Sequence, residues 1–357
     1  MSDVAARLRL LRTPGVGPVT FRQLLARFGT PGAALDALPQ LARRGGGDAP
    51  RVPDLAMVER EQATVARLGA RYLILGDADY PALLGELDNA PPALIVRGDV
   101  ALLRRVCVAI VGARNASAAA CRFARQLAHD LAGDVTVVSG LARGIDTAAH
   151  VGSLSGGTVA VIAGGIDVAF PPENAELQER IATEGLLVAE MPPGTEPRAR
   201  HFPYRNRIIA GIAQGTVVVE AAPKSGSLIT ARLAAEAGRE VMAVPGSPLD
   251  PRAQGCNLLI REGATLVQSA ADVLELLRPI DPRSVRAPAS PFDAAPPEDA
   301  SDRDRARVTD LLGPVPVGVD ELIRQAGLAP AVVQTVLLEL ELAGRLERHA
   351  GGRVSLR

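Results

Sequence analysis

The sequence predicts an α/β protein built on a doubly wound, mainly parallel β-sheet. Apolar runs of β-preferring residues alternate with helix-length segments between about residues 106 and 244, and strands covered on both faces have this unbroken apolar character. Turns of small residues follow four of these strands, as is typical of sheets that bind ligands at the carboxyl ends of their strands. A single glycine pair would be explained by a tight turn, but the repetition favours a ligand crevice.

The first strand is predicted at Val106–Val111, and a helix from about Ala116 to Ala132 connects it to a second strand at Val135–Val138. Together they form a βαβ unit. Later strands are expected at residues 158–163, 186–190, 216–220 and 240–244.

The turns after the first two strands each contain an arginine. Gly112-Ala113-Arg114 ends the first strand, and Ser139-Gly140 leads to Arg143-Gly144 after the second. A helix that begins at such a turn presents free N–H groups and the positive end of its dipole. These turns are therefore expected to bind anions.

Length and composition limit the class of protein. At 357 residues with 47% hydrophobic residues, the chain is expected to form two or three domains, and its net charge of −1 means that affinity for polyanions requires local clusters of cations. Cys107, Cys121 and Cys256 have neither paired nor metal-like spacing, which favours a reducing compartment. No signal peptide or membrane span is expected, so the predicted location is the cytoplasm.

Residues 1–70 are expected to form a helical domain, with helices near residues 4–11, 20–28, 33–41 and 55–68. Pro14–Pro18 joins the first two helices and resembles the hairpin of helix-hairpin-helix and SAM-like modules, although a simple turn between packed helices explains it equally well. Short strands with proline stops at residues 72–75, 80–84 and 91–98 are expected to add edge elements to the sheet domain, residues 71–278.

A linker is predicted over residues 279–300, because this segment is rich in Pro, Ala, Ser and Asp and lacks apolar periodicity. Residues 301–357 then show helices near 305–312, 319–325 and 329–343 and a hairpin, which is the order of a winged-helix domain. The third helix contains no lysine or arginine and carries Glu339 and Glu341. A role in protein contact is therefore at least as well supported as duplex binding.

Residues 196–209 combine cations with aromatic side chains. His201, Phe202, Arg205, Asn206 and Arg207 lie in a stretch that is too polar and too interrupted by proline to be core. Aromatic faces beside guanidinium groups suit the stacking of unpaired bases, worth about 1–3 kcal/mol per base. The alternative is a solvated charged loop whose Phe202 side chain packs into the core.

A second anion site is expected where a helix follows the strand that ends at Glu220. Its hydroxyl groups, glycine and lysine would converge on a phosphate, and they are Lys224, Ser225, Gly226, Ser227 and Thr230. No Walker motif, paired catalytic carboxylates, zinc spacing or catalytic triad is present, so the chain is expected to be a binding protein without cofactor or metal.

Several long motifs in this order resemble the DNA-processing protein A family, also called DprA or Smf. The motifs are Ile110–Arg114, Ser139–His150, His201–Ile209, Ser225–Ala231, Val244–Gly246 and Gly255–Asn257. The resemblance implies a Rossmann-like domain that binds single-stranded DNA, forms a homodimer and delivers strands to the RecA recombinase during natural transformation.

By motif, Arg114 would hold a phosphate, Ser139, Gly140 and Arg143 would line the floor of the pocket, and Phe202 would engage bases. Arg205 and Arg207 would engage bases and backbone. The full expected DNA-binding set is Gly112, Arg114, Ser139, Gly140, Arg143, Gly144, His201, Phe202, Arg205, Asn206, Arg207, Lys224, Ser225, Gly226, Ser227 and Thr230.

Two other classes of function remain open at this point. Rossmann-like folds also host nucleotide phosphoribohydrolases, but those carry a Pro-Gly-Gly-x-Gly-Thr-x-x-Glu run where this chain has Glu220 followed by Ala221 and Ala222. A structural adaptor that contacts proteins through its terminal domains is the third possibility.

Overall fold

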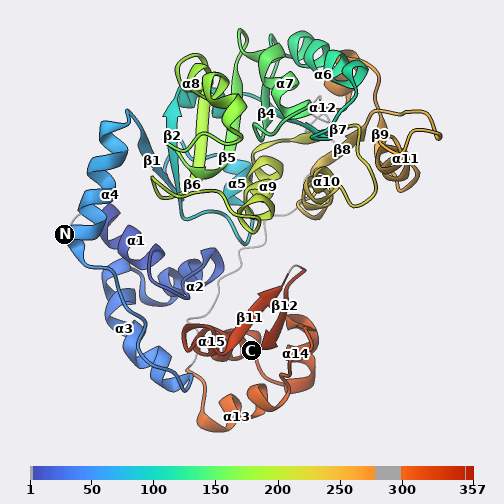
Figure 1. The fold of residues 1–357 in the computed structure, drawn as a ribbon. Helices are drawn as coiled ribbons and strands as arrows, with labels where there is room; N and C mark the ends of the chain where they lie inside the picture. The colour runs from blue at the N-terminus through green and yellow to red at the C-terminus, as the bar shows by residue number, and fades with distance from the viewer. Residues whose placement is uncertain (1–2, 278–298, 350) are drawn as a thin grey trace, which may run out of the picture. The chain divides into compact units, whose positions relative to one another are not determined.

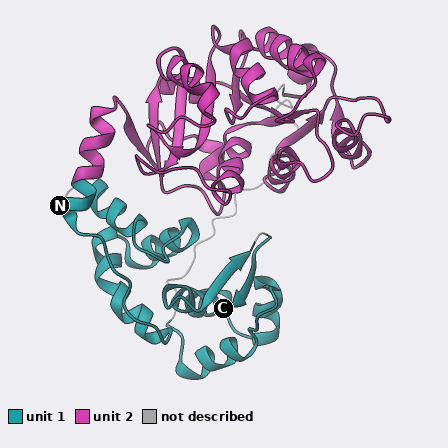
Figure 2. Ribbon diagram, viewed as in Figure 1, with its two compact units in different colours: residues 1–59, 287–357 teal, residues 60–286 magenta. Residues whose placement is uncertain are grey.

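The computed structural model describes residues 3–277, 299–349 and 351–357, and its chain forms two compact units (Figures 1 and 2). One unit is the sheet domain, residues 60–286, and the other combines Met1–Glu59 with Ala287–Arg357. The predicted linker lies outside the described residues except for Asp299 and Ala300.

The sheet domain contains a nine-stranded sheet in the order β1-β2-β6-β5-β4-β3-β7-β8-β9. Strands β3 to β9 pair in parallel, whereas β1 and β2 add an antiparallel edge. The strands are β1 (Arg71–Ile74), β2 (Ala93–Gly98), β3 (Cys107–Gly112), β4 (Thr136–Ser139), β5 (Thr158–Gly165), β6 (Leu186–Met191), β7 (Gly215–Val219), β8 (Glu240–Ala243) and β9 (Thr265–Leu266). The predicted doubly wound α/β class is confirmed.

Helices cover both faces of this sheet, because alternate side chains of each buried strand point to opposite sides. One face packs against α5 (Ala82–Gly85), α9 (His201–Ile212), α10 (Gly226–Glu236) and α11 (Gln254–Arg261). The other packs against α4 (Leu55–Arg67), α6 (Ala118–Leu131), α7 (Ile145–Ser153), α8 (Ala175–Glu184) and α12 (Ala270–Leu277). The prediction of a strand at residues 80–84 is wrong: Pro81 precedes the short helix α5.

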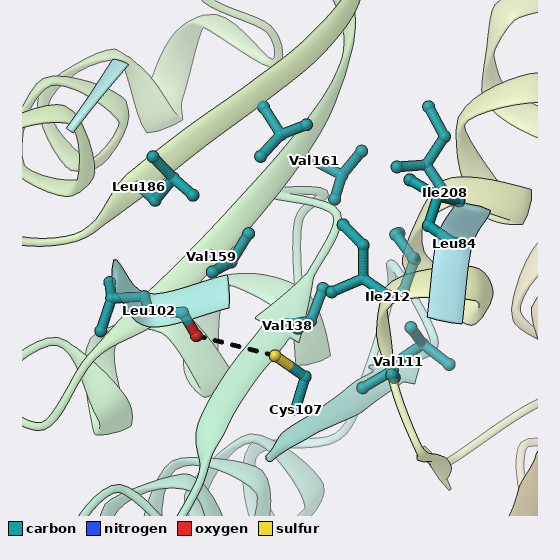
Figure 3. Close-up of a cluster of buried hydrophobic side chains, with 14 of the residues drawn as sticks. Leu84, Leu102, Cys107, Val111, Val138, Val159, Val161, Leu186, Ile208 and Ile212 are labelled. Carbon is teal, nitrogen blue, oxygen red and sulfur yellow. Dashed lines mark hydrogen bonds between the residues drawn. The ribbon is translucent and has the colours of Figure 1, made fainter. Parts of the chain in front are cut away.

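Figure 3 shows the core on the α9 side of the sheet, where the Cys107 side chain lies beside Val138 and its thiol donates to the Leu102 carbonyl at 3.8 Å. Burial raises the pKa of the Cys107 thiol to about 12 and that of the Cys256 thiol to about 11. All three cysteines are free, and these two serve as small apolar side chains.

The second unit joins the helical N-terminal segment to the C-terminal domain. Its N-terminal helices are α1 (Asp3–Leu11), α2 (Pro18–Phe28) and α3 (Pro31–Arg44). The C-terminal domain consists of α13 (Asp302–Asp310), β10 (Val317–Gly318), α14 (Val319–Ala326), α15 (Pro330–Leu342), β11 (Leu346–His349) and β12 (Arg353–Leu356). This order confirms the winged-helix prediction, and β10 adds a strand that the sequence did not indicate.

Candidate functional site

The site lies where the direction of the sheet topology reverses. From β3 the chain proceeds through β4, β5 and β6 on one side, and then returns to place β7, β8 and β9 on the other side of β3. The carboxyl ends of β3 and β7 therefore diverge into different helices and leave a crevice between them.

Two cavities open at this edge. The larger, of about 590 Å³, lies between the turn after β3 and the start of α10, and the smaller, of about 70 Å³, lies over the ends of β4 and β5. Arg114, Ala142, Phe202 and Arg205 line both cavities. The two openings therefore share one wall, and we refer to them together as the carboxyl-edge groove.

The predicted residues are brought together in this groove to a large extent. The larger cavity is lined by Gly112, Arg114, Phe202, Arg205, Asn206, Lys224, Ser225, Gly226, Ser227 and Thr230. Gly140 and Arg143 line the smaller cavity. Ser139, Gly144, His201 and Arg207 line neither cavity.

A stack of three side chains forms the shared wall. The Arg114 guanidinium carbon lies 4.9 Å from the centre of the Phe202 ring, and the Phe170 ring lies 5.7 Å from Phe202 at an interplanar angle of 53°. Phe202 is half-buried, whereas Arg114 and Phe170 are exposed. The wall therefore presents one exposed cation and an aromatic ring that remains partly accessible.

Buried cations support this wall from below. Arg205 is 6% exposed, and its guanidinium donates to the carbonyls of Gly140 and, at 2.6 Å, of Val161. Burial lowers the pKa of Arg205 to about 10, and the nearby Asp146 carboxylate opposes this change. Burial also raises the pKa of Asp146. At neutral pH Arg205 remains charged and links the turn after β4 to the middle of β5.

Residues 201–207 are helical, which differs from the irregular basic segment that the sequence indicated. His201 begins α9, and Pro203 is tolerated because N–H groups in the first turn have no partner within the helix. Arg207 is buried and donates to Glu190 at 2.5 Å, while Tyr204 is 55% exposed. Burial, reinforced by Arg200 and Arg198, lowers the pKa of His201.

The helices that begin at this edge differ in which protein groups accept hydrogen bonds from their N-terminal N–H groups. The Glu220 carboxylate accepts from the Ser117 N–H at 2.8 Å and the Ser117 hydroxyl at 2.6 Å, so an internal anion already occupies the start of α6. Asp146, in the first turn of α7, accepts from the Ala142 N–H at 3.3 Å in the turn that precedes this helix, and no described side chain caps the start of α7. Glu220 therefore occupies part of the start of α6, whereas the N-terminus of α7 stays a predicted anion site.

The start of α10 differs from that of α6 in the groups that surround it. Its first turn contains no acidic residue, and the Ser225 hydroxyl caps the Ser227 N–H at 3.4 Å. Lys224 is exposed beside it with a positive φ of 66°. This turn offers hydroxyls, helix N–H groups and an ammonium group to an anion in the groove.

The remaining predicted residues have structural positions. Ser139 is fully buried and donates its hydroxyl to Ile110 at 2.6 Å, which fastens β4 to β3. Gly144 has a φ of 75°, and a Cβ there would lie 2.8 Å from the Arg114 carbonyl oxygen. Gly144 therefore allows the two arginine-bearing turns to approach each other.

Sequence reasoning missed two contributors. Phe170 is 44% exposed beside Phe202, and its signal was an isolated aromatic residue after a strand in a chain with only six phenylalanines. Glu220 adopts a φ of 50°, which turns its carboxylate toward Ser117 and which no local pattern announces.

Other kinds of site are not found in the part of the chain that the structure describes. There, no group of three or more His, Cys, Asp or Glu side chains could hold a metal ion. Over the same residues, no helix has the length and apolar character needed to cross a membrane.

Comparison with known proteins agrees with this architecture. Residues 71–278 match the family described as DNA recombination-mediator protein A, residues 2–64 match the DprA-like N-terminal HHH domain, and residues 292–352 match the DprA winged helix domain.

Among curated relatives, the DNA processing protein DprA of Streptococcus pneumoniae is 46% identical over 205 residues, which cover 57% of this chain and 72% of that protein. Protein Smf of Synechocystis is 31% identical over an alignment that covers 100% of this chain and 99% of the relative.

Among solved structures, that of DNA processing protein A from Streptococcus pneumoniae superposes with a TM-score of 0.67 at 34% identity, covering 77% of this chain and 98% of that one. The Helicobacter pylori protein, whose structure is described in terms of its single-stranded DNA binding mode, gives a TM-score of 0.53 at 28% identity over 58% of this chain and 95% of that one. From the extent of these matches and the shared order of domains, the chain belongs to the DNA processing protein A family, also named DprA or Smf.

Proposed function

We propose that this chain binds single-stranded DNA in the carboxyl-edge groove and helps to load the RecA recombinase onto it during natural transformation. The observation that carries the binding site is the stack of Arg114, Phe202 and Phe170 between two cavities. A cation and two aromatic rings at one accessible wall match the chemistry of phosphates and unpaired bases.

Each part of the groove has a role in this proposal. Phe202 stacks with a base, and Arg114 pairs with a phosphate from a neighbouring nucleotide. The start of α10, with Lys224 and Ser225, binds a second phosphate, because no carboxylate among the described residues accepts from its N–H groups. Arg143 is exposed but pairs with Glu173 at 3.2 Å. It therefore contacts DNA only when that exposed ion pair opens.

Arg205 and Arg207 act as supports in this proposal. Both side chains are buried and already donate to protein oxygens, Arg205 to two backbone carbonyls and Arg207 to Glu190. Arg207 is neutralised by Glu190 and lines neither cavity, so of these two arginines Arg205 is the one whose charge contributes to the potential of the groove. The direct contacts belong to the exposed cations above them.

The geometry favours a single strand over a duplex. Phe202 is half-buried between Arg114 and Phe170, so only a base that can turn out of its strand presents a face to the ring. Stacked and paired bases of a duplex offer no such face. The family relation supports the same assignment, because the Helicobacter pylori relative is described as binding single-stranded DNA.

A nucleotide-hydrolysing activity is less well supported. Among the described residues that line the two cavities, the acidic side chain is Asp146, which is buried beneath the groove. Glu220, which stands near the position of the phosphoribohydrolase glutamate, is held by Ser117 at the start of α6. We therefore propose a binding protein that needs neither cofactor nor metal.

The partners in this proposal come from family membership. A homodimer, transfer of the strand to RecA and a cytoplasmic location accompany the DprA assignment, and the free thiols of all three cysteines are consistent with a reducing compartment. Light scattering at tens of micromolar tests the dimer, which a 37.1 kDa species would contradict.

Fluorescence anisotropy with a labelled oligothymidine tests the function itself. We expect saturable binding that unlabelled oligothymidine displaces and a hairpin duplex of equal length displaces poorly. Incubation with AMP should release no base. Release of adenine, or equal competition by the duplex, would reject the proposal in favour of an enzyme or a duplex-binding protein.

A further inference from the structure

The third helix of the winged-helix domain, α15, is buried on both of its long faces. Its inner face supplies the core of its own domain through a set of apolar side chains. They are Val332, Val333, Val336, Leu337 and Leu340. The outer face carries Leu338 and Leu342, which are 2% and 5% exposed and belong to a different apolar cluster. In winged-helix proteins that read DNA, the outer face of this helix enters the groove.

The N-terminal helices cover that outer face. Leu338 and Leu342 pack in one cluster with Phe21 and Leu24 of α2 and with Leu38 of α3. This cluster joins segments from opposite ends of the chain within one compact unit. Apolar burial of this kind is the main favourable contribution to association between domains.

Two glycines allow the backbones to come close. A Cβ on Gly45 would lie 2.6 Å from the carbonyl carbon of Glu339 and 2.9 Å from the Ala343 Cβ. A Cβ on Gly47 would lie 2.7 Å from the Cα of Ala343. Gly45 has an ordinary helical φ of −74°, so its own backbone conformation does not require glycine. The close contact with α15 is what excludes a side chain at this position.

Polar contacts surround the apolar cluster. Gln23 donates to Gln334 at 2.9 Å, and Arg27 donates to the Thr335 hydroxyl at 3.4 Å. Asp299, just before α13, pairs with Arg44 at 2.8 Å and with Arg27 at 3.1 Å. The interface thus has an apolar centre and a polar rim, which is the anatomy of a specific protein contact.

We propose that the N-terminal helical domain is the resident partner of the α15 outer face, so that the two ends of one chain form a clasp and the winged-helix domain binds protein in place of duplex DNA. The absence of lysine and arginine from α15 agrees with a face that does not approach phosphates, and its two glutamates are paired with Arg305 and Arg348. The sheet domain is then a sequence insertion within the clasped unit, connected to it at both of its ends.

A crosslink measures whether the clasp is closed. In a full-length chain carrying Cys121→Ser, Gln23→Cys and Gln334→Cys, a short bismaleimide should join residues 23 and 334 within one chain. Denaturing electrophoresis then shows a faster monomer band. A band at twice the chain mass would show that the contact forms between copies and would overturn the intramolecular clasp.

Matched glycine variants test the geometry. Gly45→Ala should abolish the crosslink, because its Cβ overlaps the α15 backbone. Gly32→Ala, at the start of α3, should leave the yield unchanged, since nothing lies within 4 Å of a Cβ there. Leu338→Asp, which places a carboxylate in the apolar centre, should also abolish it, and Ala331→Asp on the exposed start of α15 should not. Equal yields within either pair would overturn the proposal.

The same crosslinked protein tests which partner the α15 face accepts. Closing the clasp covalently should leave the affinity for a hairpin duplex unchanged. A severalfold loss of duplex affinity on crosslinking would show that DNA needs this face, which would overturn the assignment of the N-terminal helices as its resident partner.

Discussion

Replacing Phe202 with alanine is the sharpest test of the carboxyl-edge groove. The substitution removes the ring that touches the Arg114 guanidinium at 4.9 Å and the Phe170 ring at 5.7 Å. Loss of one stacked base costs about 1–3 kcal/mol, so the dissociation constant for oligothymidine should rise by about five- to 150-fold. The salt dependence of binding should hardly change, because no phosphate contact is removed.

Arg114→Ala should behave differently. Removing one phosphate contact should reduce the slope of log affinity against log salt by about 0.7, the value for one counterion released from a single strand. Since Arg114 and Phe202 are in contact, their double variant should not be additive. We expect a coupling of about 0.5–1 kcal/mol, the size of an exposed cation–π interaction.

Tyr204→Ala is the matched control for the loss of an aromatic ring. Tyr204 lies in the same helix, is 55% exposed and lines neither cavity, so this variant should bind like the unaltered chain. Anisotropy titrations of the unaltered chain and the four variants at several salt concentrations are the assay. If Phe202→Ala binds like the unaltered chain, or if Tyr204→Ala loses as much affinity, the stacking interpretation fails and Phe202 is a core plug.

Three further predictions concern the scaffold. Arg205→Ala leaves the carbonyls of Gly140 and Val161 without the Arg205 donor and Asp146 without its nearby positive charge. The free energy of unfolding measured in urea titrations should fall by about 3–5 kcal/mol. Arg114→Ala should leave the urea midpoint unchanged. Burial lowers the pKa of His150 to about 3, so below about pH 6.5 the unfolded chain binds a proton that the folded chain does not bind. The free energy of unfolding should therefore fall by up to about 1.4 kcal/mol for each pH unit of acidification, and less steeply in His150→Gln. Removal of residues 301–357 should leave the affinity for single-stranded DNA largely unchanged in anisotropy titrations. It should also expose the apolar face of α3, which light scattering would detect as increased aggregation.

Periodicity and turn chemistry were sufficient to predict the layers of this protein. Strands such as Cys107–Gly112 are buried along nearly their whole length, and their continuous apolar character is a local property that the sequence displays directly. The glycine turns predicted a ligand crevice at the carboxyl edge, where the carboxyl-edge groove lies, since parallel strands share one direction. The winged-helix order was equally visible from its helices and hairpin.

The tertiary structure alone decided which charges face the groove. Arg114 and Arg205 look alike in the sequence, but one is exposed beside Phe202 and the other is buried under Gly140. Pro203 suggested a broken segment, yet its place in the first turn of α9 costs no hydrogen bond.

The sequence likewise did not reveal which distant residues contact the start of α6 and the outer face of α15. Glu220 reaches Ser117 from another strand end, 103 positions along the chain, and Leu338 shares an apolar cluster with Phe21 from the opposite end of the chain. Sequence patterns report the period of a segment and therefore its type and its apolar face. They do not report which distant segment covers that face, because long-range contacts depend on how the whole chain packs.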